Sequence, residues 1–549
     1  MKYASTLLAA CAAGSLLAPI APAQAATKTV HHRAAHKRAA PPRAENSGVN
    51  QELAELRAEV NALHQELASQ RQSAATTQTQ VAQTEAQMNA LHDEVAQAPK
   101  AAHTAAREEV AVALDKEHKK GYADFKGLHI TPGGFLEMAG IYRQRFQGND
   151  MATSFAIPFP NNRAGTASES RLSARQSRLS FLAQGKVNKD VTLSMYGEFD
   201  FLGGAQTANS NESNSFNPRI RHLYGTIDWA HNGGGIHLLA GQNWSLITLN
   251  TKGITPRNEL TPPQIDAQYI PGFFWARQPQ LRLTVDTADH KLWLAVSAEN
   301  AATTTVGTVP TSLITYNATA GSGFDTANSL SLNGTPDFVG KVAYEGSVAG
   351  RSLHVEGFAL SRTFTAHLNG GYNINRAGYG FGGGAVFQAV PGKLDLQFSG
   401  IVGKGIGRYG SAQLGDVTFD ANGMIHPVGE FMLLGGATFH ATKRLDLYLF
   451  AGKEQETGYS FASGYGNASS TANNAGCFIE GGTCSGNTRR VQQLTTGFWN
   501  KLYSGSFGHA QVGLQYAYTQ RQLFADANGI MPQVGENIGF LSFRYYPFN

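Results

Sequence analysis

The sequence is poor in charged residues and in cysteine. Only 15% of its 549 residues are Asp, Glu, Lys or Arg, whereas 61 residues are glycine. This composition is unusual for a soluble enzyme. Of the three cysteines, Cys11 lies in the N-terminal segment, which leaves Cys477 and Cys484 for the body of the chain. The formal net charge of +4 is too small to indicate a nucleic-acid-binding protein.

Long apolar runs are also missing. Beyond the N-terminal segment, no apolar run reaches the roughly 18 residues that a membrane helix needs. A chain that spans a membrane without such helices must do so as a closed β-barrel. The catalytic and phosphate-binding motifs G-x-S-x-G, H-E-x-x-H and the P-loop do not occur. We therefore expect a protein that is not an enzyme and that carries no cofactor and no metal site.

The N-terminal segment has the pattern of a secretory signal peptide over residues 1–25. Lys2 supplies the positive start, residues 3–20 form the apolar stretch, and Ala23-Gln24-Ala25 is a small-residue cleavage site. Residues 26–50 then form a basic tail, whose composition predicts disorder. The tail is either a solvated spacer or an electrostatic contact for an anionic component of the cell envelope.

A heptad pattern predicts a coiled coil over residues 51–98. Apolar side chains recur every seven residues, at Leu53, Val60, Leu67, Ala74, Val81, Met88 and Val95. Leu56, Leu63 and Leu91 occupy positions three residues further on, which is the spacing of a coiled-coil seam. A coiled coil needs partner chains, so this region predicts an oligomer; a single amphipathic helix is the alternative. Pro99 ends the pattern, and residues 99–121 are expected to form a helical linker.

From residue 122 onward the pattern changes to strict alternation, which is clearest between residues 177 and 201. Leu193, Met195 and Phe199 fall on one face of the second half, and Ser194 and Glu198 fall on the other. A period of two over about ten residues predicts strands long enough to cross a bilayer, apolar towards lipid and polar towards a wet lumen. The turn-forming Asn188-Lys189-Asp190 makes the two halves a hairpin.

The same pattern predicts sixteen strands in residues 122–549. They are expected at 135–146, 171–187, 191–203, 217–230, 235–248, 277–286, 290–300, 336–346, 351–363, 377–390, 393–406, 428–440, 445–457, 489–503, 507–522 and 536–548. Long and short connections alternate between them, as in outer-membrane barrels, and the even number places both ends of the barrel on one side of the membrane. The expected fold class is therefore all-β, a transmembrane antiparallel β-barrel of about 16 strands preceded by an α-helical coiled coil.

Several pieces of this region, taken in order, resemble the DcaP-like trimeric porins of Gram-negative bacteria. They are SRLSF at 177–181, GEFDF at 197–201, RIRHLYG at 219–225, LLAGQNWS at 238–245, RQPQLR at 277–282, PDFVGK at 336–341 and the ending FRYYPF, which the extra Asn549 follows. The resemblance implies a homotrimer of barrels in the outer membrane, in contact with lipid and lipopolysaccharide. It also implies a periplasmic coiled coil and passage of small anionic solutes such as dicarboxylates.

Candidate pore residues lie on the polar face of the strands and in the third long loop, residues 249–276. The resemblance to sixteen-stranded porins implies that this loop folds inward and narrows the channel. The charged candidates are Lys252, Arg257, Glu259 and Asp266 in the loop and Arg143, Arg145, Arg178, Arg282 and Lys341 on the strands. Arg282 and Lys341 lie near mid-strand, where a pore charge acts most strongly on a passing solute. Any of these charges is either a guide for solutes or one half of a lumenal ion pair.

Cys477 and Cys484 are only seven residues apart, in the long connection 458–488. Since an exported loop lies in an oxidising environment, we expect a local disulfide between them. The function that best fits all these features is an outer-membrane diffusion porin with a preference for small anions such as dicarboxylates or other organic acids. The alternatives are an envelope tether and a trimeric adhesin-like structural protein that uses the coiled coil and the basic tail.

Overall fold

The computed structural model describes residues 123–203, 216–318 and 330–548, together with three isolated positions at 65, 83 and 86. Apart from these isolated positions, the predicted signal peptide, basic tail, coiled coil and linker lie outside the described residues. Among the residues that the structure describes, no helix is long and apolar enough to cross a bilayer.

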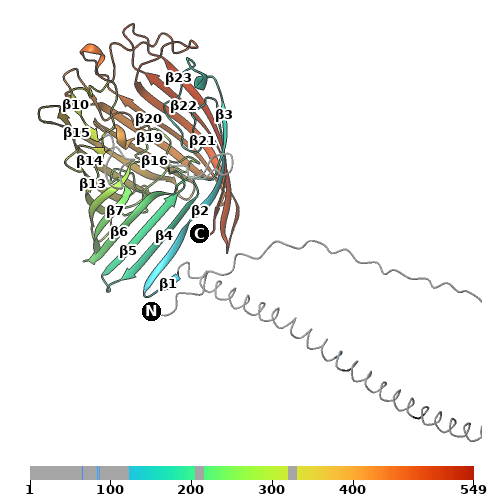
Figure 1. Cartoon of the computed structure of the whole chain (residues 1–549). Helices are drawn as coiled ribbons and strands as arrows, with labels where there is room; N and C mark the ends of the chain where they lie inside the picture. Colours follow the sequence, from blue (N-terminus) through green and yellow to red (C-terminus); the bar gives the residue numbers. More distant parts are fainter. Residues whose placement is uncertain are drawn as a thin grey trace, which may run out of the picture. The chain divides into compact units, whose positions relative to one another are not determined.

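Sixteen antiparallel strands form one closed barrel (Figure 1). In barrel order they are β2 (Leu128–Arg143), β4 (Arg178–Lys186), β5 (Val191–Asp200), β6 (Arg219–His231), β7 (Gly234–Trp244), β8 (Arg277–Asp286), β9 (Leu292–Glu299), β13 (Asp337–Val348), β14 (Arg351–Leu368), β15 (Asn373–Val390), β16 (Leu394–Lys404), β19 (Gly429–His440), β20 (Leu445–Glu456), β21 (Thr488–Gly505), β22 (Gly508–Leu523) and β23 (Gln533–Tyr546). The barrel closes because β2 pairs with β4 on one edge and with β23 on the other. The prediction of a sixteen-stranded antiparallel barrel is confirmed.

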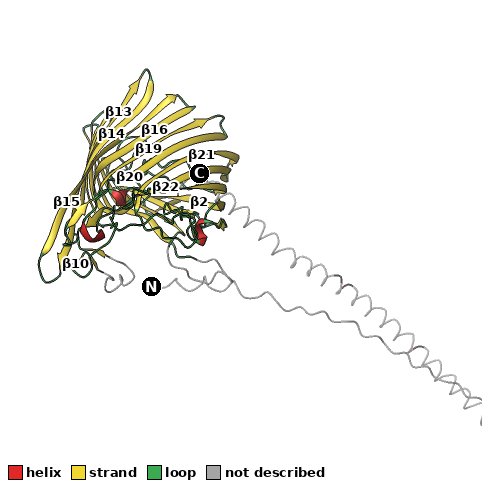
Figure 2. Ribbon diagram, turned by 90° about the horizontal axis from the view of Figure 1, so that it is seen from above, coloured by secondary structure: helices red, strands yellow, loops and turns green. Residues whose placement is uncertain are grey.

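The remaining short elements belong to the connections. They are β1 (Ala123–Phe125), β3 (Glu169–Ser173), β10 (Ile314–Thr315), β11 (Asn317–Ala318), β12 (Leu330–Ser331), β17 (Val417–Phe419), β18 (Ile425–Pro427) and the 3-10 turns η1 (Arg163–Gly165), η3 (Gly407–Tyr409) and η4 (Ala462–Gly464). Most of the longer connections leave one end of the barrel, the loop end, whereas connections of two to five residues close the other, the turn end. Figure 2 shows the 3-10 turns and the loops gathered within the curve of the sheet.

The prediction of one continuous strand over residues 171–187 is wrong in one respect. The structure divides it into β3 and β4, because β2 changes partner from β4 to β3 between Phe135 and Ala139. Gly134 has φ +119°, and a Cβ there would lie 2.2 Å from the carbonyl oxygen of Arg178, so only glycine fits without distortion. Ser177 in the interruption accepts a 2.9 Å hydrogen bond from the backbone N–H of Glu137, which keeps the opened ladder bonded.

The two faces of the sheet differ as the alternation predicts, but buried apolar side chains fill part of the lumen, which was expected to be polar. Outward-facing Leu193, Met195 and Leu541 are exposed, as side chains that meet lipid must be. Several apolar clusters are buried inside. In one, Trp499 and Phe540 of the wall pack with Ile265 and other residues of the loop between β7 and β8. Apolar contacts therefore attach the loop between β7 and β8 to the barrel wall.

Arg362 is a buried ionic anchor between the wall and two of the long loops. Its guanidinium lies 3.1 Å from Asp337 on β13 and 2.5 Å from Asp416 in the loop after β16. It also donates to the carbonyl oxygens of Ala302 and Gly405, each at 2.5 Å. All three charged side chains are shielded from solvent, so removing one leaves the others unpaired in a low-dielectric site.

Replacing Arg362 with Met is therefore expected to lower the free energy of unfolding by about 3–5 kcal/mol. The measurement is urea-induced unfolding of the barrel in lipid vesicles. Arg376→Met on β15 is the matched control, because Arg376 is exposed and donates only to the adjacent carbonyl of Asn375. Its effect should stay within about 0.5 kcal/mol. Equal stability of the two variants would contradict the anchoring role.

Candidate functional site

The connection between β7 and β8, residues 245–276, is called the inward loop here, because its contacts lie on the inner wall. It forms after the fifth barrel strand, as the resemblance implied for the third loop. Near its start, the backbone N–H of Gly253 bonds to Glu345 of β13 at 2.5 Å. Further on, the carbonyl oxygen of Pro263 accepts a 2.7 Å hydrogen bond from the indole N–H of Trp499 on β21. Near its end, the N–H of Gly272 bonds to Glu454 of β20 at 2.7 Å. The loop thus touches the walls on both sides of the lumen.

Lys341 holds the first part of this loop. Its ammonium lies 2.6 Å from Glu356 of β14 and donates at 2.8 Å to both the carbonyl of Thr248 and the side chain of Asn250. Glu356 in turn accepts from the backbone N–H of Asn250 at 3.1 Å. The side chain of Lys341 has no exposed surface. Lys341 is therefore covered by the inward loop and is one half of an ion pair, which is one of the two roles expected for it.

Arg282 and Glu259 form a second buried attachment. The Arg282 guanidinium lies 3.9 Å from the Glu259 carboxylate and donates to the carbonyl of Trp244 at 2.6 Å. Glu259 also accepts from Asn243 at 2.9 Å. Arg282 is only 3% exposed, so it too lies on the inner face as predicted and is one half of a buried ion pair. Both charges of the pair serve the conformation of the loop.

Asp266 anchors the far part of the loop to β22. One carboxylate oxygen accepts from the amide of Gln515 at 2.6 Å, and the other accepts from the hydroxyl of Thr153 at 3.3 Å. The Gln515 oxygen accepts from the N–H of Ile265 at 2.7 Å, so one side chain clasps two consecutive loop residues. Burial raises the pKa of the Asp266 carboxyl to about 6, because the charged form is desolvated and no cation touches it.

Arg143 and Arg145 likewise attach a connection to the wall. Arg143 is fully buried, lies 3.0 Å from Glu169 and donates to the carbonyls of Asn149 and Asp150. Arg145 donates to the carbonyl of Gly535 at 3.0 Å and to that of Gly165. Both hold the connection after β2 against the wall. Lys252, by contrast, is exposed on the inward loop, and no described residue forms an ion pair with it.

Arg178 and Arg257 belong to a different set of side chains, which we call the basic wall. Its arginines are Arg178, Arg219, Arg221, Arg257, Arg277 and Arg544, and its carboxylates are Glu137, Glu198 and Asp200. Six arginines against three carboxylates leave a formal charge of +3. Except for Arg257, which comes from the inward loop, the members lie on β23 and on the strands from β2 to β8.

The carboxylates of the basic wall are shared between arginines and shielded from solvent. Glu198 lies 4.0 Å from Arg178 and is also paired with Arg221. Asp200 lies 3.1 Å from Arg221 and 2.6 Å from Arg219. The Asp200 side chain has no exposed surface, whereas that of Arg219 is 27% exposed. Arg178 and Arg219 are therefore more exposed than the carboxylates with which they pair.

The guanidinium groups of Arg257 and Arg277 have no carboxylate partner among the described residues. Arg257 is exposed and donates to the hydroxyl of Tyr224 at 3.3 Å. Arg277 donates to Gln268 at 2.8 Å and lies over the ring of Trp244, with 4.6 Å between its guanidinium carbon and the ring centroid. Each keeps donors that point to no anion of the chain, which suits a transient anionic ligand.

A cavity of about 280 Å³ lies where β6, β7 and β8 reach the loop end. Three arginines line it, Arg219, Arg277 and Arg408, together with Trp275 of the inward loop. A second cavity, of about 390 Å³, lies towards the turn end and combines loop residues such as Pro263 with His354 and His440 of the wall. Among the described residues, no cluster of His, Cys, Asp or Glu is arranged to hold a metal ion.

Sequence reasoning missed Arg219, Arg221 and Arg277. At Arg221 the ladder between β5 and β6 contains a bulge, so that Arg221 and His222 are both buried, which strict alternation forbids. Arg277 starts its strand with the parity of the exposed Leu281, yet it turns inward onto Trp244. The available signal was the sequences RIRHLYG and RQPQLR themselves, which place arginines at the ends of two strands.

Cys477 and Cys484 are joined as a disulfide in the connection between β20 and β21, with their Cα atoms 4.6 Å apart. Cys477 is buried against Ile157 and Phe159 of the connection after β2, in an apolar cluster shared by two long loops.

Comparisons with known proteins place the fold among outer-membrane porins. No family model matches the sequence, and no curated protein matches it. The solved outer membrane channel DcaP of Acinetobacter baumannii is similar in structure, with a TM-score of 0.55 at 18% identity, over 77% of this chain and 99% of that chain. An anion-selective porin from Comamonas acidovorans has a TM-score of 0.39 at 12% identity, over 76% of this chain and 99% of that chain. Salmonella typhi OmpF has a TM-score of 0.41 at 10% identity, over 77% of this chain and 100% of that chain.

Replacing Lys341 with Met should loosen the first part of the inward loop. The substitution leaves Glu356 without its cation, and two loop acceptors lose their donor. We expect amide hydrogen exchange of residues 248–256 to be about 10- to 100-fold faster, as the loss of buried polar contacts implies. Lys404→Met on β16 is the control, since Lys404 is exposed. Unchanged exchange in the Lys341 variant would refute the attachment.

The attachment at Asp266 should weaken as the pH rises. Because burial raises the pKa of this carboxyl from 3.8 to about 6, the folded state binds the proton more tightly than the unfolded state does. The stabilisation is therefore complete below about pH 3.8 and is lost as the pH passes through about 6. Amide exchange of residues 263–268, corrected for its intrinsic pH dependence, should show less protection at pH 8 than at pH 5. Asp266→Asn should remove this difference; its persistence would count against the assignment.

Proposed function

We propose that this protein is an outer-membrane diffusion channel for small anions, similar in function to the DcaP-like porins. The closed sixteen-stranded barrel supports the proposal of a channel, because a barrel of this size can enclose an aqueous path. The single observation that carries the anion preference is the basic wall, with its formal charge of +3 and its shielded carboxylates.

The electrostatic argument depends on which charges remain accessible. Glu454 and Glu456, on the strand wall across from the basic wall, accept hydrogen bonds from Gly272, Ala412 and Gly415 and are buried under the loops. Arg178 and Arg219 of the basic wall are partly exposed and Arg257 is exposed, whereas Arg221 is buried. A narrow site with low-dielectric walls magnifies the field of its nearest charges. A carboxylate that enters therefore meets guanidinium donors that replace part of its lost hydration.

Small dicarboxylates and other organic acids are the proposed solutes. The cavity of about 280 Å³ beside Arg219, Arg277 and Arg408 has room for such a molecule, and arginine can hold a carboxylate through two parallel hydrogen bonds. Arg257, on the inward loop, offers a further contact deeper in the lumen. Binding at each step has to be weak, since a channel must release what it admits.

The domain organisation belongs to the same proposal. Residues 1–25 would be removed as a signal peptide, residues 51–98 would form a trimeric coiled coil in the periplasm, and residues 122–549 would form the membrane barrel of a homotrimer. The turn end would then face the periplasm.

Intact mass of the exported protein tests the cleavage, since an N-terminus other than Ala26 would refute it. Cross-linking tests the trimer, and products no larger than a dimer would refute that.

Replacing both Arg257 and Arg277 with Gln should slow the passage of succinate about threefold to tenfold relative to a neutral sugar of similar size. The two side chains have no carboxylate partner among the described residues, so the change removes charge without exposing an unpaired anion. The measurement is swelling of liposomes that contain the purified protein.

The matched control for this experiment is the pair Lys443→Gln and Arg444→Gln, which removes the same charge from the exposed turn between β19 and β20. The control should leave the ratio of succinate to sugar uptake unchanged. If the control lowers the ratio as much as the basic-wall variant does, the net charge of the protein and not the basic wall sets the preference.

A further inference from the structure

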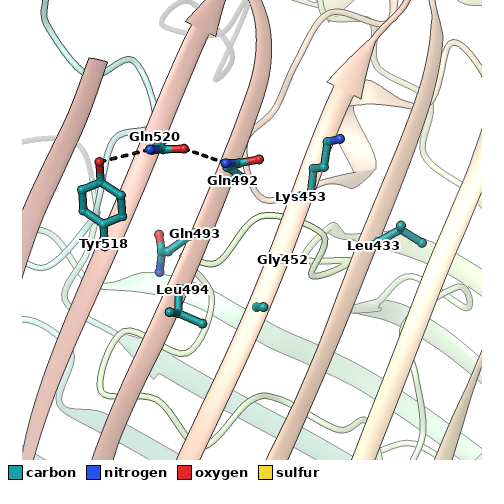
Figure 3. Close-up of a pocket in the computed structure, with 9 residues that line it drawn as sticks. Leu433, Gly452, Lys453, Gln492, Gln493, Leu494, Tyr518 and Gln520 are labelled. Atoms are coloured by element: carbon teal, nitrogen blue, oxygen red, sulfur yellow. Dashed lines mark hydrogen bonds between the residues drawn. The ribbon is translucent and has the colours of Figure 1, made fainter. Parts of the chain in front are cut away.

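A polar patch interrupts the outward face of the barrel on β20, β21 and β22. Lys453, Gln492 and Gln520 lie side by side there, since Lys453 is paired with Gln492 in one ladder and Gln492 with Gln520 in the next. Figure 3 shows the three side chains at one level across neighbouring strands. Leu494 and Leu433, on the same face, are exposed apolar residues. A row of this polarity is out of place on a surface that meets only hydrocarbon.

The patch borders a surface cavity of about 400 Å³. Gln492 donates to Gln520 at 2.6 Å, and Gln520 donates to the hydroxyl of Tyr518 at 3.1 Å, as the dashed lines in Figure 3 show. These two hydrogen bonds fix the side chains of Gln492, Gln520 and Tyr518 at the edge of the cavity. Leu433, Leu494 and the ring of Tyr518 supply its apolar part. The cavity is therefore amphipathic.

Lys453 and Arg490 make this patch cationic. Arg490 lies on β21 two ladder positions nearer the loop end than Gln492, on the same face and opposite Gln455. It donates to Gln533 at 2.9 Å, and the Lys453 ammonium lies 4.9 Å from the ring centroid of Phe431. No carboxylate among the described residues pairs with either cation. Two cations at the edge of an apolar belt, with only neutral partners, complement an anionic headgroup whose acyl chains continue along the belt.

We propose that this patch binds the phosphate of a lipid headgroup in the leaflet at the loop end. Lys453 and Arg490 hold the phosphate, Gln492 and Gln520 donate to its ester or sugar oxygens, and the acyl chains lie along Leu433 and Leu494. The proposal rests on the membrane location given under the proposed function, but not on the solute preference. Charge complementarity favours this occupant over a second copy of the chain, because the patch presents no anion for an opposing cation.

Native mass spectrometry of the full chain in detergent, titrated with bisphosphorylated lipid A, tests this site. The doubly substituted variant Lys453→Gln/Arg490→Gln is expected to retain the lipid about tenfold less than the unmodified protein, since charge-assisted hydrogen bonds to the phosphate are lost. Monophosphorylated lipid A should bind less well than the bisphosphorylated form. The control variant Lys443→Gln/Arg444→Gln, with the same loss of charge at the turn end, should retain the lipid fully.

Equal retention by the double variant, or an equal loss in the turn-end control, would overturn the proposal. A variant that loses its oligomeric state instead of its lipid would identify the patch as a contact between copies and would overturn it as well. Should the double variant fail to fold, the single changes Lys453→Gln and Arg490→Gln carry the test, each with about threefold weaker retention. Succinate uptake by these variants should stay normal, so failure here and failure of the anion channel are separate results.

Discussion

The pairing of β2 with β23 is the constraint on which the rest of the structure depends. In lipid, every backbone N–H and C=O of a spanning segment needs a partner, so an open sheet edge is not tolerated. The ladder from Leu136↔Tyr545 to Arg143↔Ile538 provides these partners. Glu137 and Arg544 reinforce it from the lumenal side at 3.0 Å. Arg544 lies on this closing ladder, so the pairing that closes the barrel also brings Arg544 next to the other members of the basic wall.

The inward loop then decides which charges of the closed barrel remain functional. Lys341, Arg282 and Asp266 hold the loop, and Glu454 and Glu456 of β20 accept hydrogen bonds from its backbone and from that of the connection after β16. Arg178, Arg219 and Arg257 of the basic wall remain accessible. A nearly balanced composition is thereby converted into a local excess of positive charge, through burial and not through residue counts.

Strand positions could be read from the sequence because the side-chain period of a strand in a bilayer is imposed by two different solvents. The strand from Arg277 to Asp286 was predicted with its observed bounds. Alternation could not predict which inner-face side chains are buried under loops, nor where a strand has a bulge or changes its partner. Arg282 and Lys341 were placed on the inner face, yet the covering loop is contributed by distant sequence. The bulge at Arg221 and the change of partner of β2 after Phe135 arise from pairing between strands, which no single strand encodes.

The central claim is that the accessible arginines of the basic wall make the channel prefer anions. The most direct measurement is the reversal potential of the unmodified protein in a planar bilayer across a KCl gradient, at ionic strengths of about 0.1 M and about 1 M. The account predicts a potential of the sign given by chloride permeation, larger at low salt, where the screening length is about 10 Å instead of about 3 Å. A potential of the opposite sign, or one that does not depend on salt, would contradict it.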